Sequence, residues 1–592
     1  MKTWRLNFLK LFFFLLLFAL VGRLFYWQVL NYNELAEAAT EQHLTTIRID
    51  SPRGRILSAD GNILAGNQKA YLLFAMIPEI EKNLGKSQKY VDKVKEIVDK
   101  LTPILYKETI SQKVEPEKLS KKEKETIEAN LRNDMTDKLS KQSLVWVPLF
   151  RKLSQNSAEE IKKIDIKGLG FEEQNRRFYP EGSLGGFLLG FVGKDSEGND
   201  RGYFGLEGFY QDQLQGQSGT LTQEVDASGK PIISLEDAGS QPKQGLDIQT
   251  TIDRTVQYTV EKYLFDGAKK YGAKHASAIV MDPKTGEILA LANYPSYDPL
   301  KWDQFEDKIR KNNAISDVYE PGSTFKGVTA AAALDSGIVK PETICPCAGP
   351  LKIAEYEVQT WNNKYSPNST MAQILQHSDN IGAAFWAQQL GKEKFIKAVR
   401  DFGFGTTTGI DLQGEETGLL KKNQDWGEID LATGGFGQGL SVTALQMVNA
   451  FSVIANDGKL MRPYVVKKII SKDKEIENSP KVLRTVLKKE TAVKMREMLL
   501  SAVEQGEAKR IIPKGMRVGG KTGTAQIPLN GRYDPSKTVA SFIGFGPVED
   551  PRFVMIVKYV EPVPIYGAET AEPTFFKIAS DLYSYWGIAI NN

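Results

Sequence analysis

The sequence predicts an α/β (α+β) protein in three parts: one N-terminal transmembrane helix, an elongated pedestal domain, and a C-terminal domain with helices layered on an antiparallel sheet. A chain of 592 residues is too long for a single hydrophobic core. A long apolar run follows the first ten residues. After residue 246, strand-like segments at both ends of the region enclose apolar segments with helical spacing, a pattern typical of a layered antiparallel sheet.

The first 30 residues predict a retained membrane anchor. Lys2, Arg5 and Lys10 precede the apolar run 11–30, and about 20 apolar residues suffice to cross a bilayer as a helix. Positive charge before the span places residues 1–10 in the cytoplasm and the rest of the chain outside it. The alternative is a cleaved signal peptide, for which 36–38 (Ala-Glu-Ala) offers a site. The run exceeds the roughly 7–15 apolar residues of a signal core, which favours the anchor.

Arg23 interrupts the apolar run. A charged side chain is costly in lipid. It either reaches the outer interface along its own aliphatic stem or faces a partner membrane helix, and the sequence leaves both interpretations open.

Residues 31–240 form the predicted pedestal. A polar, helical stalk is expected over 32–42, and 47–66 alternates apolar and polar residues around Asp60-Gly61, which indicates strands and a hairpin. A Lys- and Glu-rich insertion, about 80–145, predicts solvated helices. The Gly- and aromatic-rich segments 171–193 and 205–219 are expected as strands and turns. The small, polar residues 238–242 predict a linker before the C-terminal domain 246–592.

Two hairpins are predicted in the C-terminal domain. The first joins 276–281 to 287–293 through the turn sequence 282–286 (Asp-Pro-Lys-Thr-Gly), and the second joins 540–545 to 553–559. The segments 371–390 and 492–503 have the apolar spacing of helices.

Composition excludes several classes of protein. The formal net charge is +3 without a basic stripe, so nucleic acid is not an expected partner. Three histidines and two cysteines make a protein-built metal site unexpected, and no cofactor motif is present. Cys345 and Cys347, separated by Pro346, would lie in an oxidising compartment. Free thiols and a local disulfide both remain open, and the pair is interpreted as structural or incidental.

The segment 320–326 (Glu-Pro-Gly-Ser-Thr-Phe-Lys) predicts a nucleophilic site. Pro-Gly before the Ala-rich run 330–333 and Gly337 after it mark the start and end of a helix. Ser323 then lies in the first turn, and Lys326 lies three residues later on the same face. Because a serine hydroxyl needs a base to become a good nucleophile, the pair suggests a serine acyl-enzyme. Ser-x-x-Lys also occurs at Ser240 and Ser471, in polar, turn-like contexts, so the pattern alone carries little weight.

Two further triplets follow in order. Ser378-Asp379-Asn380 lies where two helical stretches join, and Lys521-Thr522-Gly523 lies in a Gly-rich strand where backbone can approach a ligand closely. Each motif alone is weak evidence for a catalytic site, and it is the order of the three, with spacings of 55 and 143 residues, that indicates one.

This set resembles that of the penicillin-recognising serine enzymes. The anchor and three pedestal segments (53–56, 177–180 and 205–207) resemble class B penicillin-binding proteins, the D,D-transpeptidases that crosslink peptidoglycan. The segments 319–326 and 437–443 look closest to the cell-division branch. The resemblance implies a penicillin-binding transpeptidase fold behind a pedestal of the dimerisation type. It implies D-Ala-D-Ala stem peptides and β-lactams as ligands, and a membrane-embedded glycan polymerase as partner.

The resemblance also implies roles for single residues. Ser323 would attack the donor carbonyl and Lys326 would accept its proton, while Ser378 and Asn380 relay protons and hold the substrate amide. The strand residues Lys521, Thr522, Gly523 and Thr524 would bind the terminal carboxylate and dock the peptide, with the N–H groups of Ser323 and Thr524 as the oxyanion hole. His377, which borders the second triplet, is expected to be a packing residue.

Several alternatives remain. An elongation-specific transpeptidase would share every motif. A D,D-carboxypeptidase or β-lactamase would share the triplets, but no convincing Glu-x-x-Leu-Asn segment supplies a base for water. A bifunctional enzyme would need a glycosyltransferase domain with a Glu-Asp pair and a histidine downstream of it. The only histidine in residues 31–240 is His43. A catalytically dead β-lactam-binding scaffold is not separated by sequence.

Overall fold

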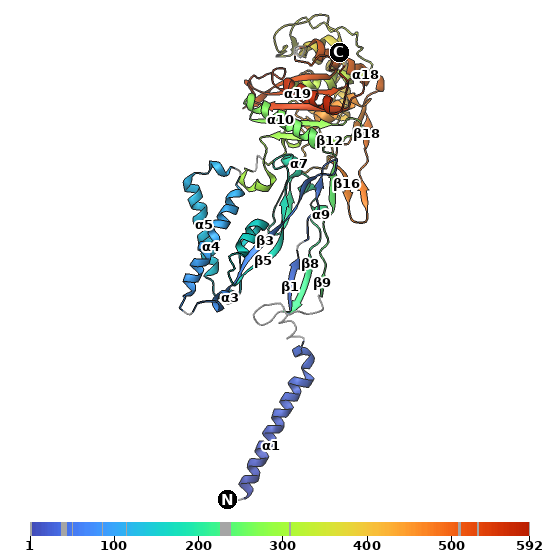
Figure 1. Cartoon of the computed structure of the whole chain (residues 1–592). Helices are drawn as coiled ribbons and strands as arrows, with labels where there is room; N and C mark the ends of the chain where they lie inside the picture. The colour runs from blue at the N-terminus through green and yellow to red at the C-terminus, as the bar shows by residue number, and fades with distance from the viewer. Residues whose placement is uncertain are drawn as a thin grey trace.

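The computed structural model shows an elongated molecule with the first helix standing apart from the rest (Figure 1). α1 (Thr3–Phe25) continues into the π-helical turn η1 (Tyr26–Leu30), and no residue of either is buried. Together they form the one helix, among the described residues, that is long and apolar enough to span a membrane. The structure describes residues 3–36, 44–49, 51–85, 87–113, 115–224, 238–306, 310–506, 511–529 and 532–590. The expected helical stalk is described only as far as residue 36, and the small-x-small site 36–38 lies mostly outside this part.

The pedestal is built on one long strand. β3 (Ile63–Met76) pairs with β2 (Ile56–Leu57), β4 (Trp146–Ser154) and β5 (Leu169–Phe178), each antiparallel. The β2–β3 connection is the hairpin predicted at Asp60-Gly61, where Gly61 has φ 84°. β1 (Leu44–Ile49), β8 (Gly219–Glu224) and β9 (Ala238–Ser240) form a separate three-stranded sheet.

The Lys- and Glu-rich insertion is helical, as predicted, but it is more than a solvated surface. α3 (Ile77–Lys82), α4 (Tyr90–Ser111), α5 (Lys121–Leu139) and α6 (Gln155–Lys162) pack with β3 and β4 around one hydrophobic core. Ile97, Leu101 and Leu105 of α4 are fully buried in it. The helical spacing of these residues was masked in the sequence by the many charges between them.

The prediction of strands over 205–219 is wrong. This segment forms two short helices, α8 (Gly205–Phe209) and α9 (Gln211–Leu214). The reason is electrostatic as much as local: Glu207 is fully buried between two guanidinium groups. Its carboxylate lies 2.5 Å from Arg53 Nε and 2.6 Å from Arg177 Nε. These tertiary contacts outweigh the local preference of a glycine-rich segment for strands and turns.

A continuous sheet crosses the predicted domain boundary. β10 (Asp247–Thr250) pairs in parallel with β2 of the pedestal and antiparallel with β16 (Val466–Ile470) of the C-terminal domain. Asp247 accepts hydrogen bonds from the backbone and the guanidinium of Arg55 at 2.6–2.9 Å. The predicted linker 238–242 begins as strand β9, so its first residues are paired. The two domains are therefore tied by a strand.

The C-terminal domain has the predicted antiparallel sheet layered with helices. Its strand order is β12-β11-β21-β20-β19, and all pairs are antiparallel. Both predicted hairpins are present: β11 (His275–Met281) with β12 (Ile288–Tyr294), and β20 (Arg532–Gly546) with β21 (Phe553–Val560). β19 (Gly519–Leu529) is one of the two edge strands, β12 being the other.

Helices cover both faces of this sheet. On one face α10 (Arg254–Lys270) and α19 (Ala571–Tyr585) share a core with alternate strand residues such as Ala278 and Val557. On the other face lies the larger core with α12 (Lys326–Asp335), α14 (Asn380–Leu390), α17 (Ala444–Ala455) and α18 (Lys489–Gln505). The remaining elements of the described chain are η2 (Pro116–Lys118), α7 (Gly186–Leu189), β6 (Phe191–Lys194), β7 (Asp200–Tyr203), η3 (Pro299–Gln304), α11 (Asn313–Ser316), η5 (Gly322–Phe325), β13 (Leu351–Ile353), β14 (Tyr356–Val358), α13 (Met371–His377), α15 (Lys392–Asp401), η6 (Asn423–Asp425), α16 (Glu428–Gly435), β15 (Lys459–Met461), β17 (Glu475–Glu477) and β18 (Val482–Thr485).

Candidate active site

The predicted nucleophile lies on a tight turn packed against β19, an edge strand of the sheet. Ser323 belongs to the 3-10 turn η5, which leads directly into α12. Gly322 has φ 54°, a conformation that favours glycine, and a Cβ there would come within 3.2 Å of Ala525 Cβ on β19. Ser323 is half-buried. The turn therefore holds the hydroxyl beside β19.

Lys326 is fully buried, and its amine is surrounded by oxygen atoms. Nζ lies 3.0 Å from Ser323 Oγ, 2.6 Å from the Ser378 carbonyl oxygen, 3.2 Å from Ser378 Oγ and 2.8 Å from Asn380 Oδ1. A neutral amine in this position can donate two hydrogen bonds and accept one from the serine hydroxyl. The geometry thus permits proton transfer from Ser323 to Lys326.

The second triplet lies at the break between α13 and α14. Ser378 ends α13 in the left-handed conformation (φ 53°, ψ 42°), which turns its carbonyl toward Lys326. Asp379 begins α14 as its cap, and its Oδ1 accepts hydrogen bonds from the backbone of Ile381 and Gly382. The Asn380 amide nitrogen donates to the Gln359 carbonyl at 2.9 Å, which leaves its oxygen facing the lysine.

The third motif lines β19. Lys521 is 5% exposed, and its Nζ lies 3.1 Å from Thr522 Oγ1. Gly523 admits a close approach, since a Cβ there would lie 2.6 Å from Ser541 Oγ and 2.8 Å from Thr324 Cγ2. Thr524 Oγ1 accepts a hydrogen bond from the Gly567 N–H at 3.1 Å. The structure therefore places this strand directly against the nucleophile turn.

Sequence reasoning missed the contacts that tie the turn to its surroundings. The Glu320 carboxylate accepts hydrogen bonds from the Gly439 N–H at 3.0 Å and from the Tyr533 hydroxyl at 3.1 Å. Burial raises the pKa of Glu320, and both hydrogen bonds act against that rise. The burial and the ionic hydrogen bond to Glu320 together raise the pKa of Tyr533 to about 12. No sequence signal joins two residues so far apart.

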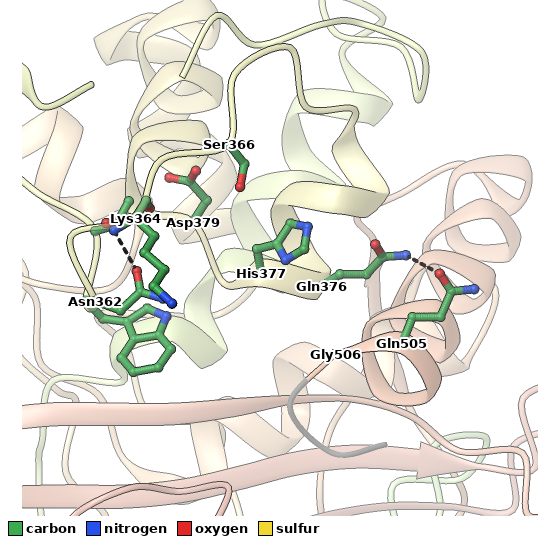
Figure 2. Close-up of a pocket in the computed structure, with 10 residues that line it drawn as sticks. Asn362, Lys364, Ser366, Gln376, His377, Asp379, Gln505 and Gly506 are labelled. Carbon is green, nitrogen blue, oxygen red and sulfur yellow. Dashed lines mark hydrogen bonds between the residues drawn. The ribbon is translucent and has the colours of Figure 1, made fainter. Parts of the chain in front are cut away.

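A polar cavity of about 310 Å³ borders the second triplet (Figure 2). Its walls include Trp361, Lys364, His377 and Asp379, and the Gln376 amide donates to Gln505 across one side. His377 is exposed and faces this cavity, so its prediction as a packing residue is wrong.

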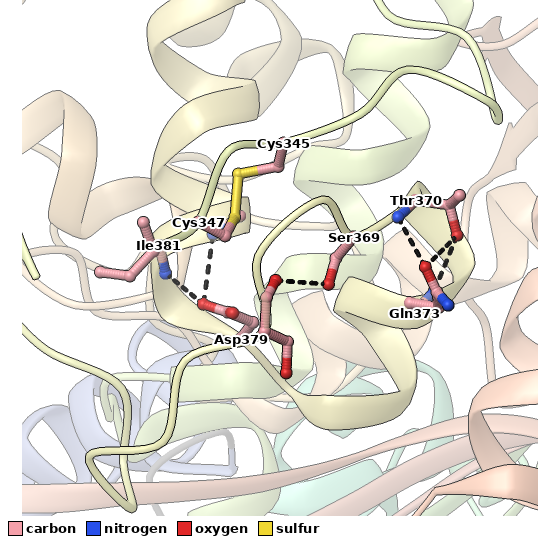
Figure 3. The surroundings of a disulfide bond; sticks show 9 residues. Cys345, Cys347, Ser369, Thr370, Gln373, Asp379 and Ile381 are labelled. Atoms are coloured by element: carbon pink, nitrogen blue, oxygen red, sulfur yellow. Dashed lines mark hydrogen bonds between the residues drawn. A yellow bond between two sulfur atoms is a disulfide. The ribbon is translucent and has the colours of Figure 1, made fainter. Parts of the chain in front are cut away.

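Cys345 and Cys347 form a disulfide with an S–S distance of 1.96 Å (Figure 3). Both cysteines are buried, and the Cys345 N–H donates to the Ser369 carbonyl at 3.0 Å. Asp379 lies nearby in the same view. Of the two states left open by the sequence, the structure has the disulfide.

The competing copies of the motifs lie elsewhere in the fold, two of them in turns. Ser471 and Lys474 close the exposed turn between β16 and β17, where the Lys474 N–H donates to Ser471 Oγ. Lys284 lies in the β11–β12 turn and forms an ion pair with Asp550. Ser240 ends β9 in the pedestal. Only the set Ser323, Lys326, Ser378 and Asn380 is brought together around one amine.

Comparison with known proteins gives one consistent set of relatives. The family profile "Penicillin binding protein transpeptidase domain" matches residues 276–580, and "Penicillin-binding Protein dimerisation domain" matches 48–250. The chain is 33% identical to "Stage V sporulation protein D" of Bacillus subtilis, over 99% of this chain and 86% of that one. It is 31% identical to "Peptidoglycan D,D-transpeptidase FtsI" of Escherichia coli, over 73% of this chain and 71% of that one. The crystal structure of Penicillin Binding Protein 2X from Streptococcus thermophilus superimposes with a TM-score of 0.72 at 24% identity, covering 92% of this chain and 80% of that one, which is a likeness of fold.

Proposed function

Because the chain belongs to the family of penicillin-binding transpeptidases, we propose that it crosslinks peptidoglycan through an acyl-enzyme on Ser323. The reaction is a serine-type D,D-transpeptidation of stem peptides that end in D-Ala-D-Ala, and β-lactams are the corresponding inhibitors. The observation that carries the residue assignment is the 3.0 Å contact between Lys326 Nζ and Ser323 Oγ inside a buried ring of oxygens.

In the first half of the reaction Ser323 Oγ attacks the carbonyl carbon of the penultimate D-Ala. Its proton passes to Lys326 Nζ as the C–O bond forms. Collapse of the tetrahedral intermediate breaks the peptide bond, and the leaving amine of the terminal D-Ala takes a proton. Ser378 Oγ, which lies 3.2 Å from Lys326 Nζ, is placed to relay it.

In the second half an amine of a neighbouring stem attacks the ester. Its proton returns to the base, the C–O bond to Ser323 breaks, and the hydroxyl is restored. The same base serves both halves, which requires that Lys326 exchange its proton without leaving the pocket. The four oxygen contacts of the structure restrain its amine in this pocket.

The strand β19 is proposed to bind the donor peptide. An edge strand offers unpaired backbone groups to an extended peptide. Lys521, with Thr522 and Thr524 on the same strand, would receive the terminal carboxylate, and Gly523 lets the peptide approach the backbone. The N–H groups of Ser323 and Thr524 would form the oxyanion hole, since η5 packs against β19 at this level.

Labelled penicillin tests the assignment. The full chain should acquire one covalent adduct, mapped by mass spectrometry to Ser323. Ser471→Ala, in the exposed Ser-x-x-Lys turn, is the matched control and should label as the unmodified protein does. An adduct on another residue, or labelling that survives Ser323→Ala, would refute the assignment. A protein that folds and never labels would be a scaffold rather than an enzyme.

The side of the membrane and the membrane partner belong to this proposal. The single N-terminal helix anchors the chain. The charges of Lys2, Arg5 and Lys10 before the span support a cytoplasmic N-terminus and catalysis outside the cell membrane. We propose a membrane partner that polymerises glycan, since the two matched domains are a transpeptidase and a dimerisation domain. The segments 319–326 and 437–443 support a role in cell division over one in elongation.

A further inference from the structure

A second cavity, of about 500 Å³, lies far from Ser323, between the pedestal and the C-terminal domain. Its pedestal walls are β4, β5 and the hairpin of β6 and β7, and the turn η3 closes it from the C-terminal domain. Figure 1 shows β3 and β5 between the arm of α4 and α5 and the three-stranded sheet, and residues of β5 line the cavity. Ligand cavities are usually about 300–1,000 Å³, so this one is large enough for a small ligand.

Positive charge dominates the lining. Two acidic residues, Asp200 and Asp303, face six basic ones: Arg53, Arg151, Lys152, Arg176, Arg177 and Lys194. Two carboxylates are each shared by two cations. Glu207 contacts both Arg53 and Arg177, and Asp200 contacts both Lys152 and Lys194. Each cluster therefore retains about one unit of positive charge.

Two guanidinium groups of the lining differ in their access to the cavity: Arg177 has a donor that is closed off from solvent, and Arg151 is exposed. The Arg177 side chain is 5% exposed; Nε donates to Glu207 and Nη1 to the Gly54 carbonyl, while Nη2 has no hydrogen-bond partner among the described residues. Arg151 is exposed and forms no ion pair in the described part of the chain. It is therefore the group of this wall that can receive an added anion.

A strained bulge presents two of the cations. The pairing of β3 with β4 shifts register between Tyr71 and Leu73, so that Leu72 faces two residues, Arg151 and Lys152. Lys152 has φ 54°, an uncommon conformation for a residue other than glycine. Bulges of this kind redirect side chains and are frequent beside binding sites. Here the bulge directs both neighbouring cations to the same cavity.

We infer that this cavity binds the carboxylate-bearing stem peptide of a second peptidoglycan segment, away from the catalytic serine. The inference rests on the proposed function, because that function makes a polymer with repeated carboxylates the protein's substrate. The amide side chains of Gln112, Gln174 and Asn175 also line the cavity and match the peptide and N-acetyl groups of such a ligand. A folded protein partner would need about 800 Å² of surface on each side, which a concave pocket does not offer.

The test uses the full chain in detergent, with Ser323 first acylated by penicillin so that the active site is closed. Calorimetric titration with a soluble disaccharide pentapeptide that carries free carboxylates should show saturable binding at one site. The same compound with its carboxylates converted to amides should bind at least tenfold more weakly. Raising the salt concentration should weaken the binding, as expected for exposed charges.

Three variants locate the site. Arg151→Gln should weaken binding several-fold, and Arg151→Gln with Lys152→Gln should weaken it at least tenfold. Lys163→Gln, at the exposed end of α6 and outside the cavity, is the matched control and should bind as the unmodified protein does. Penicillin labelling and thermal unfolding of each variant report folding, and the single exposed change Arg151→Gln keeps the test valid if the double variant is unstable.

Absence of saturable binding, or equal binding by the cavity variants and Lys163→Gln, would overturn the inference. Two competing ligands, a decapeptide of Asp and Glu and inorganic phosphate, are titrated in parallel. If either binds as tightly as the disaccharide pentapeptide, the cavity is a general anion site and the stem-peptide assignment is wrong. Failure of penicillin to label Ser323 at the outset would instead refute the proposed function.

Discussion

Lys326→Arg should nearly abolish acylation although it preserves a positive charge. Lys326 is fully buried, and its Nζ is the one atom that contacts Ser323 Oγ, the Ser378 carbonyl and Asn380 Oδ1 together. A guanidinium cannot give up its proton at any accessible pH, so it cannot accept the proton of Ser323. The substitution therefore removes the base and leaves a fixed cation in its place.

The size of the effect follows from two contributions. General-base catalysis by a positioned side chain is worth about 10²–10⁴ in rate, or roughly 3–5 kcal/mol of transition-state free energy. The larger guanidinium also has to enter a closed pocket, and such overpacking costs about 1–3 kcal/mol of stability. Lys521→Arg is the comparison within the same site. Lys521 is assigned to carboxylate binding, which arginine also performs, so less than about a tenfold loss is expected.

The assay is the second-order rate constant of acylation by one β-lactam, measured across a pH series. Lys326→Met separates the two contributions, since methionine fits the volume but has no base. Losses of similar size in Lys326→Arg and Lys326→Met, not recovered at high pH, are expected. Equal losses in Lys326→Arg and Lys521→Arg, or a milder loss in Lys326→Arg, would show that the two lysines do not have these separate roles.

Three further predictions concern stability and the membrane helix. Glu207→Gln should lower the free energy of unfolding by roughly 3–5 kcal/mol in denaturant titration, because it leaves the buried guanidiniums of Arg53 and Arg177 without their carboxylate; a loss below 1 kcal/mol would mean that water already compensates them. Burial raises the pKa of Glu261 from 4.5 to about 7. Its contribution to the free energy of unfolding is therefore present below pH 4.5 and is lost as the pH rises through 7. The total loss is roughly 3 kcal/mol. Glu261→Gln should remove that loss, whereas Glu160→Gln on the exposed face of α6 should not, and unchanged pH profiles of melting temperature in both variants would contradict the assignment. Arg23→Leu should reduce co-purification of a membrane partner if Arg23 faces another helix, and unaltered co-purification and cell shape would leave Arg23 as an interfacial residue only.

Local signals in the sequence predicted well where the motif segments lie in the fold. Pro-Gly before an Ala-rich run gave the turn that carries Ser323, and the interruption of apolar spacing at Ser378 gave the junction of α13 and α14. The turn at 282–286 and the second hairpin followed from turn residues between alternating strands. Each of these features depends on a few neighbouring residues, which is why one sequence suffices to predict them.

Features set by distant contacts could not be predicted in this way. Glu320 and Tyr533 meet only because β20 folds back over the nucleophile turn. The helices at 205–214 depend on a buried Glu207 whose cations lie in other segments. The core of the insertion was hidden by its charges, since α4 has only one buried stripe among many lysines and glutamates. The cavity at the domain junction has no sequence signal, because its cations come from β4, β5, β6 and, with Arg53, the segment before β2.

The arrangement around Lys326 also explains how motifs so widely spaced can act as one unit. A fully buried amine requires several oxygen partners, and the turn η5 just before its helix supplies one of them, Ser323 Oγ. Ser378 supplies a carbonyl because it ends α13 in a left-handed turn, and Asn380 supplies an amide oxygen because Gln359 holds the other end of its side chain. The number of residues between the motifs is therefore free to vary. What has to be kept is a helix that ends beside the nucleophile turn. Proline cannot adopt the φ of 53° that Ser378 has at this end. Ser378→Pro should therefore impair acylation more than Ser378→Ala. Similar acylation rates for the two variants would show that the side chain, and not the turn, makes the essential contact.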